Sequence, residues 1–270
     1  MNLYPSKFRR SRSGFTMVEI AICLAIIGIA LVGIIGVLPY GMNTQRDTRE
    51  ETIIDQDVAM LLPAISQGMH GVDDLTNYVF AITNYQTLYN DQGVPATTIN
   101  TYGYTYTNSS LNNGTSIGPW ITNGQNIVGI LSTPEYVNSV TLQPLPNVIN
   151  GGFSNHVVAY VRALSGLASE KPPQDNPLMI GDAFTYRLLV VNAPVALDTN
   201  TFNTSYSYQL WQNQRELRLT FLSPQQPNGT LGNNRLTYRA TIAGQLAPTN
   251  MNNNYTLYFY QPQSFTVNTN

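Results

Sequence analysis

Residues 7–42 read KFRRSRSGFTMVEIAICLAIIGIALVGIIGVLPYGM, and the rest of the chain is organised around this stretch. Its first part is basic, and the 23 residues from 20 to 42 then carry no charged side chain. As a helix that rises 1.5 Å per residue, this run extends about 35 Å, which is enough to cross a bilayer. Because the positive charges precede the apolar run, we expect a cytoplasmic N-terminus, with the rest of the chain on the other side of the membrane.

Glu19 is the unusual residue, because it lies at the start of the apolar run. A carboxylate costs about 2.5–3.5 kcal/mol at the centre of a membrane helix and less near the interface, so Glu19 needs a partner. A cut between Gly14 and Phe15 would create an α-ammonium four residues before Glu19. Residues four apart share one face of a helix, so that amine, from the same or a neighbouring subunit, could neutralise the carboxylate.

The sequence of residues 14–19, GFTMVE, followed by an apolar helix, resembles the class III signal of type IV pilins and type II secretion pseudopilins. In that family a membrane peptidase cuts after the glycine and methylates the new N-terminal phenylalanine, and a glutamate at the fifth mature position registers subunits in a filament. The resemblance implies cleavage after Gly14, methylation of Phe15 and a registering role for Glu19. It also implies three partners: the prepilin peptidase and methyltransferase, other pilin or pseudopilin subunits, and an inner-membrane assembly platform.

Two other interpretations of the N-terminus are open. A conventional secretory signal needs a small-residue cleavage site after the apolar run, and residues 38–42, LPYGM, make a poor one. An uncleaved signal anchor fits the apolar run better, but it leaves the order of Gly14, Phe15 and Glu19 unexplained.

Four residues that destabilise or kink a helix lie inside the apolar run: Gly28, Gly33, Gly36 and Pro39. A proline inside a helix removes one hydrogen bond, and each glycine costs about 1 kcal/mol relative to alanine. These residues predict either a segment that melts or bends during assembly, as in filaments of the family, or close helix packing in lipid.

A second helical segment is expected after the membrane. Residues 44–47, TQRD, have the spacing of a capping box. Apolar residues then recur at helical steps from Ile54 to Val72, which predicts an amphipathic helix with one apolar face. Pro63 should interrupt and kink this helix, and Gly68 and Gly71 mark its expected end.

The remaining chain predicts strands. Residues 73–155 indicate a loop-rich variable region with two to four strands, including short runs at 78–83 and 127–131. In residues 156–270 the runs that suit strands are 156–164, 183–191, 206–211, 215–222, 236–242 and 255–260. Within 215–222, Leu217, Leu219 and Phe221 should face inward and Glu216, Arg218 and Thr220 outward, and residues 228–229, NG, predict a hairpin turn. We therefore predict an α+β protein, with a long transmembrane and stalk helix packed on a C-terminal antiparallel β-sheet domain, as in pilins.

The composition of the chain limits the classes of function that it can have. Only 10% of the 270 residues are charged, whereas about 25% is typical. Loss of residues 1–14 removes four of the 13 cations and no acid, which leaves nine against 15 acids and a formal charge of −6. This balance argues against nucleic-acid binding. Cys23 is the single cysteine, so no intramolecular disulfide can form, in contrast to many pilins.

No pattern for catalysis is present, and we predict no enzyme activity and no cofactor. Several members of the family bind calcium, and the acidic pairs Asp73 with Asp74 and Asp175 with Asp182 are weak candidates for its ligands. The 17 tyrosines favour packing within sheets, although exposed Tyr with Asn could also form a surface for sugars or proteins.

These observations predict a structural subunit of a type IV pilus-like filament or of a type II secretion pseudopilus. Its expected parts are a leader (1–14), a transmembrane and assembly helix (15–42), a stalk helix (43–72), a variable region (73–155) and a β-domain (156–270). We expect the chain in the bacterial inner membrane, in contact with lipid and with its C-terminal domain periplasmic or extracellular, and then in a filament. A mature chain of 256 residues, 270 less the 14 of the leader, is large for the family and favours a minor subunit or a pseudopilin. The alternative is a single-pass anchored protein that binds or adheres to surfaces.

Overall fold

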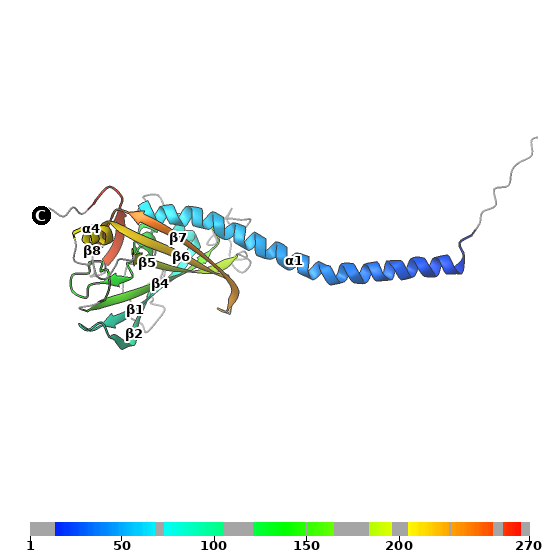
Figure 1. The fold of residues 1–270 in the computed structure, drawn as a ribbon, viewed down its shortest axis with the longest axis horizontal. Coiled ribbons are helices and arrows are strands. Elements are labelled where there is room, and N and C mark those ends of the chain that lie inside the picture. The colour runs from blue at the N-terminus through cyan, green and yellow to red at the C-terminus, as the bar shows by residue number, and fades with distance from the viewer. Residues whose placement is uncertain are drawn as a thin grey trace, which may run out of the picture. The chain divides into compact units, whose positions relative to one another are not determined.

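The computed structural model describes residues 14–67, 73–104, 121, 123–148, 151–164, 184–195, 205–226, 228–250 and 256–265. The chain divides into two compact units, residues 1–49 and residues 50–270. Figure 1 labels the main helices and strands.

Helix α1 spans Met17–Gln67, so it forms the described part of the first unit and continues into the second. It has no break after the apolar run. Thr44 Oγ1 donates to the carbonyl of Tyr40 at 3.0 Å, and Thr48 Oγ1 donates to the carbonyl of Thr44 at 2.9 Å. Both hydroxyls thus bond backwards within a continuous helix, and the predicted capping box at residues 44–47 is wrong.

Both prolines of the helical region lie inside α1. Each lacks the N–H that would bond to the fourth residue before it, yet the helix continues on either side of Pro39 and Pro63. The expected interruption at Pro63 therefore does not occur. The predicted end at Gly68 and Gly71 lies outside the described residues.

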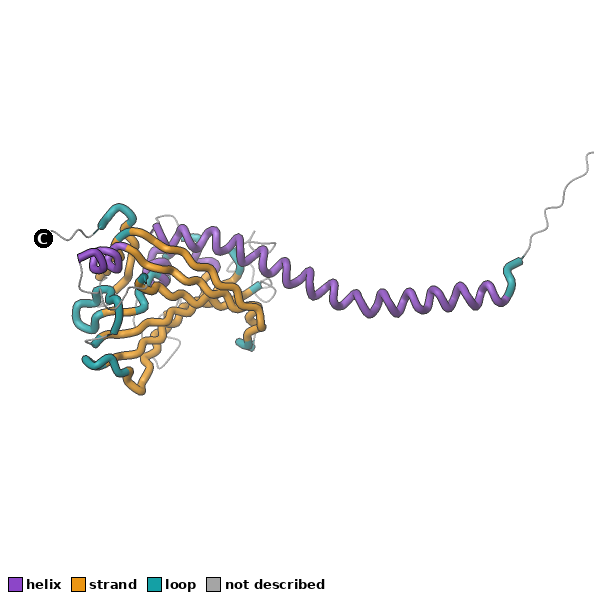
Figure 2. The backbone as a smooth tube through the Cα atoms, in the orientation of Figure 1, coloured by secondary structure: helices purple, strands orange, loops and turns teal. Residues whose placement is uncertain are grey.

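The second unit is built on an antiparallel sheet, and its strands are orange in Figure 2. The seven strands of this sheet run in the order β2-β1-β4-β5-β6-β7, with β3 paired to β4. The strands are β1 (Val79–Tyr89), β2 (Pro95–Tyr104), β3 (Tyr136–Val137), β4 (Gly152–Arg162), β5 (Thr185–Pro194), β6 (Gln214–Gln225) and β7 (Leu231–Ala243). A separate two-stranded sheet pairs β8 (Gln245–Asn250) with β9 (Thr256–Gln261). Among its described residues the unit also contains three short helices: α2 (Leu75–Tyr78), α3 (Gly124–Leu131) and α4 (Ser205–Asn213). The long apolar helix followed by an antiparallel sheet confirms the predicted α+β class.

The central strands follow the predicted alternation. In β6, Leu217, Leu219 and Phe221 are fully buried, while Glu216 and Arg218 are half-buried on the other face. Thr220, also predicted to face outward, is 6% exposed, and its hydroxyl pairs at 3.1 Å with that of the exposed Thr237 across β6 and β7.

The hairpin between β6 and β7 turns where the sequence predicts it. Gly229 adopts a φ of 82°, a conformation that glycine reaches without strain. Asn228 Oδ1 accepts a hydrogen bond from the amide of Thr230 at 3.0 Å, which closes the turn.

The core lies on one face of the sheet and includes the C-terminal part of α1. Within residues 50–67, the helix buries Ile54, Leu61 and Ile65 completely. They pack in one cluster with α3, with the inward residues of the sheet and with β9. The stalk helix is thus part of the folded domain, as the apolar spacing predicts.

Two of the predicted strands are helices. Residues 127–131 lie in α3, which Asn123 caps by accepting a 2.7 Å hydrogen bond from the amide of Asn126. Residues 206–211 lie in α4, which contacts β6 and β8. A short apolar run such as 127–131 does not distinguish a buried helix from a strand, and the alternating run 206–211 forms a helix against its period-two pattern. The other predicted runs, at 78–83, 156–164, 183–191, 215–222, 236–242 and 255–260, all coincide largely with strands.

Candidate processing and assembly site

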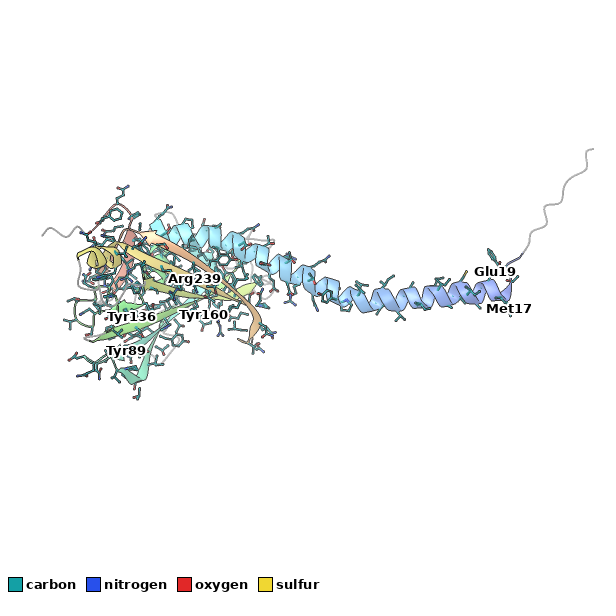
Figure 3. All side chains as sticks on the ribbon, in the orientation of Figure 1. Met17, Glu19, Tyr89, Tyr136, Tyr160 and Arg239 are labelled. Atoms are coloured by element: carbon teal, nitrogen blue, oxygen red, sulfur yellow. The ribbon has the colours of Figure 1, made fainter. Side chains whose placement is uncertain are left out.

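The predicted processing residues lie just before α1. Gly14 and Phe15 precede the first helical residue, Met17, and the Phe15 side chain is 86% exposed. Figure 3 labels Met17 and Glu19 at the N-terminal end of the helix. Residues 14–16 have no regular secondary structure and are exposed, so the predicted cleavage between Gly14 and Phe15 stays a prediction at an accessible position.

Glu19 forms a reciprocal cap with Thr16. Its Oε2 accepts hydrogen bonds from the backbone amide of Thr16 at 2.7 Å and from Thr16 Oγ1 at 2.8 Å. In return, Thr16 Oγ1 accepts from the amide of Glu19 at 3.3 Å. This arrangement is a capping box, and it stabilises the first turn of the helix by pairing amides that have no partner within the helix.

The role of Thr16 was not predicted, although its signal is in the sequence. Residues 16–19 have the Thr-x-x-Glu spacing of a capping box at the start of an apolar run. The similar spacing at residues 44–47 lies inside the continuous helix α1 and forms no cap there. The cap also bears on the predicted partner of Glu19, because the carboxylate binds the amide directly after Phe15. An ammonium group on Phe15 would therefore lie one residue before the Thr16 amide, which already donates a hydrogen bond to Glu19.

The apolar run presents its side chains on every side of α1. Large apolar residues from Ile20 to Met42 are more than half exposed, and no residue of this segment is buried. By length and composition, α1 is able to cross a membrane. A continuous apolar surface of this kind marks contact with lipid or with other protein.

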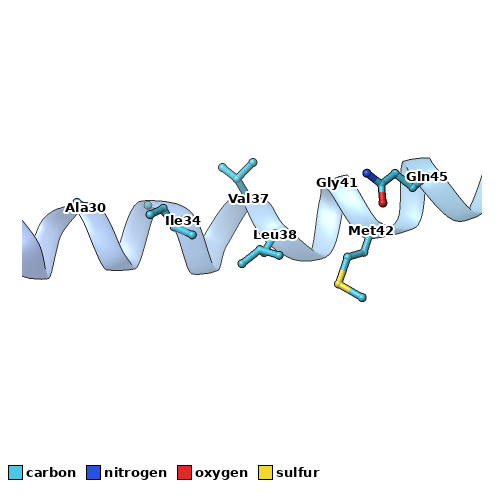
Figure 4. Close-up of a pocket in the computed structure, with 8 residues that line it drawn as sticks. Ala30, Ile34, Val37, Leu38, Gly41, Met42 and Gln45 are labelled. Atoms are coloured by element: carbon cyan, nitrogen blue, oxygen red, sulfur yellow. The ribbon is translucent and has the colours of Figure 1, made fainter.

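Gly28, Gly33, Gly36 and Pro39 all lie in intact helix, so their role in melting stays a prediction. A Cβ atom on any of the three glycines would meet no neighbouring atom within 4 Å. Figure 4 shows the hollow that small residues leave on this helix, between side chains such as Ile34, Leu38 and Met42. Small residues on one helix face allow a second helix to approach closely.

The calcium candidates are not gathered into one site by the described residues. Asp73 Oδ1 accepts from the amide of Gly124 at 3.4 Å, and Asp74 precedes α2 without a capping hydrogen bond from its side chain. Asp175 and Asp182 lie outside the described residues. Within the described ranges no three His, Cys, Asp or Glu residues are grouped as metal ligands.

Comparison with models of protein families gives one match. Residues 9–35 match the prokaryotic N-terminal methylation motif, which is the class III prepilin signal. The chain therefore carries this signal directly ahead of an apolar helix, and its α+β arrangement fits a pilin-like fold. No curated protein and no solved structure matches the chain.

The motif and the geometry together define the class of protein. A methylation motif at an exposed helix start indicates a prepilin substrate similar to type IV pilins and pseudopilins. The apolar helix fits a membrane-anchored pilin, and a motif of this type is typical of structural subunits.

Proposed function

We propose that this chain is a structural subunit of a type IV pilus-like filament or a type II secretion pseudopilus. The observation that carries the proposal is the methylation motif at residues 9–35, which overlaps the start of an apolar helical segment with exposed side chains. Prepilin peptidase cuts after Gly14, and its methyltransferase activity modifies the amine of Phe15.

Assembly proceeds through the apolar segment of α1. The helix first anchors the subunit in the inner membrane, with the N-terminus cytoplasmic and the second unit periplasmic. The assembly platform then transfers it into a filament, where neighbouring helices replace lipid around the side chains from Ile20 to Met42. Glu19 sets the register, because its charge is best satisfied where an N-terminal amine lies close by. This mechanism is one of assembly and uses no cofactor.

The intact mass and N-terminal sequence of the protein from native membranes test the proposal. A chain that begins at N-methylated Phe15 supports it. A chain that retains residues 1–14 contradicts it and favours a membrane-anchored protein that binds surfaces. A Gly14→Ala variant serves as a matched control, because it should remain uncleaved while keeping the apolar helix and the folded domain.

A further inference from the structure

The core-facing side of the sheet becomes polar at one end of β1. Ile82, Asn84 and Gln86 alternate along this strand and therefore share one face. Ile82 is fully buried in the core, and Asn84 pairs with the core residue Val157 of β4, so this is the inward face. Gln86 in turn pairs with Asn155 of β4. Three amide side chains thus occupy inward positions where apolar residues would normally pack.

Hydrogen bonds fix the orientation of all three amides. Asn155 Nδ2 donates to the carbonyl of Pro134 at 3.1 Å, so the oxygen of Asn155 faces the other two amides. That oxygen accepts from Asn84 Nδ2 at 3.1 Å and from Gln86 Nε2 at 3.2 Å. The remaining polar atom of Asn84 is therefore its acceptor oxygen.

Asn84 Oδ1 has no hydrogen-bond partner among the residues described, although the residue is only 7% exposed. Buried side-chain oxygens are normally paired, because an unpaired one loses its bonds to water without replacement. An acceptor of this kind is satisfied by a group that donates a hydrogen bond.

A cavity of about 330 Å³ lies over this amide cluster. Tyr102 and Tyr104 of β2, Thr133 and Ser139 contribute to its polar lining together with the amides, and Ile130, Leu142 and Leu257 are among its apolar lining residues. Among the residues that the structure describes, none of the lining side chains is charged. The volume is at the lower end of the range of small-ligand sites.

We propose that this cavity binds a neutral sugar unit. A sugar hydroxyl can donate to Asn84 Oδ1, and other hydroxyls can pair with the hydroxyl groups of the lining, since each is both a donor and an acceptor. Tyrosine rings offer an apolar face beside a polar edge, which suits the two kinds of surface on a sugar ring. The absence of charge from the lining disfavours an anionic or cationic ligand, which would leave a charge unpaired in a partly buried site.

The site lies within the second unit and uses no residue of α1. It adds a recognition function to the proposed assembly function, and binding does not depend on whether residues 1–14 are removed. Either proposal can therefore fail while the other stands.

Saturation-transfer NMR on the full chain tests the proposal. The protein is held in a detergent without a sugar headgroup, and the probes are the methyl glycosides of glucose, galactose, mannose and N-acetylglucosamine, with trialanine as a peptide comparator. We expect saturation transfer to at least one glycoside. The Asn84→Leu variant should weaken that binding at least about tenfold, the factor that 1.4 kcal/mol represents. Thr87→Val is the matched control, because Thr87 points to the opposite face of β1.

Tyr102→Ala provides a second variant, in β2, which removes a lining tyrosine ring and leaves the three amide side chains in place. The thermal transition of each variant shows whether it remains folded. The proposal is overturned if no glycoside receives saturation, if only trialanine does, or if folded Asn84→Leu and Tyr102→Ala variants bind as the unmodified chain does.

Discussion

The hydroxyl of Tyr186 in β5 donates a 2.8 Å hydrogen bond to Asp57 Oδ2 in α1, and both residues are fully buried. The same carboxylate oxygen accepts from the amide of Leu164 at 3.0 Å. These bonds join the C-terminal part of α1 to segments more than 100 residues later in the chain. The helix is therefore attached to the sheet by specific polar contacts as well as by its apolar face.

Tyr186→Phe should lower the free energy of unfolding by about 1–3 kcal/mol, because it removes a donor from a buried carboxylate while keeping the ring. Chemical denaturation of the full chain measures this change. Tyr40→Phe is the control, since Tyr40 is 77% exposed on α1, and it should leave the transition unchanged. Equal stability of the Tyr186 variant and the unmodified chain would show that the hydrogen bond contributes no net stabilisation.

The buried tyrosines predict loss of stability at alkaline pH. Burial raises the pKa of Tyr186 well above its ordinary value of 10.0, and the Asp57 carboxylate raises it further. Burial also raises the pKa of Tyr104, Tyr258 and Tyr260. Below pH 10 these phenols are neutral in both folded and unfolded chains, so they cause no pH dependence there.

Above pH 10 the unfolded chain ionises its tyrosines while the folded chain does not, so stability falls as pH rises. Phenolate absorbance and circular dichroism, recorded together from neutral to strongly alkaline pH, measure this. We expect the buried tyrosines to ionise only as the circular dichroism of the sheet is lost. Full ionisation with the sheet intact would contradict the assignment of these residues to the core.

Glu19→Ala should leave membrane insertion intact and impair filament assembly. The variant removes both the carboxylate proposed to set the register and the cap on Thr16. Membrane fractionation reports insertion, and recovery of sheared filaments reports assembly. Glu51→Ala removes an exposed carboxylate from the same helix and should assemble normally.

Glu19→Gln separates the two roles of that side chain. A glutamine at this position of a capping box can still accept from Thr16, so the helix start is preserved while the charge is lost. If Glu19→Gln assembles as well as the unmodified chain, the cap is needed for assembly and the charge is not. That result would contradict the proposal that the charge of Glu19 sets the register of subunits.

The sequence predicted the features that depend on local pattern. The motif before Met17, the apolar face that contains Ile54 and the turn at Gly229 each depend on residues close together in the chain. Residues 127–131 were predicted as a strand, because five apolar or small residues fit a buried strand as well as a helix. The cap formed by the Asn123 side chain distinguishes the two, because it marks the start of a helix.

The cavity could not be predicted, because its residues come together only through long-range pairing. Alternation alone places Asn84 and Gln86 on one face of β1, but it does not tell which face is inward. Pairing with β4 determines that face, and residues from β2, α3 and β9 then close the site. The contact between Tyr186 and Asp57 could not be predicted either, because the two residues lie far apart in the chain.

Gly129 in α3 provides a test of how closely that helix packs on β9. A Cβ atom at this position would lie 2.8 Å from Phe259 Cζ and 2.9 Å from Leu257 Cβ. The phenylalanine ring can turn away, but Leu257 Cβ is fixed to the backbone of β9, so the strand must shift. We expect Gly129→Ala to lower the free energy of unfolding by about 1–3 kcal/mol through overpacking, less the gain of about 1 kcal/mol in helix propensity.

Gly36→Ala is the matched control for Gly129→Ala, because it has the same propensity gain and a Cβ there meets no atom within 4 Å. Thermal unfolding followed by circular dichroism compares the two variants in the full chain. A lower midpoint for Gly129→Ala alone supports close packing of α3 on β9. A midpoint raised equally in both variants would mean that β9 moves away from the added methyl group without loss of stability. In that case the same movement would widen the cavity that Leu257 and Tyr258 help to line, and sugar binding should change in the Gly129 variant.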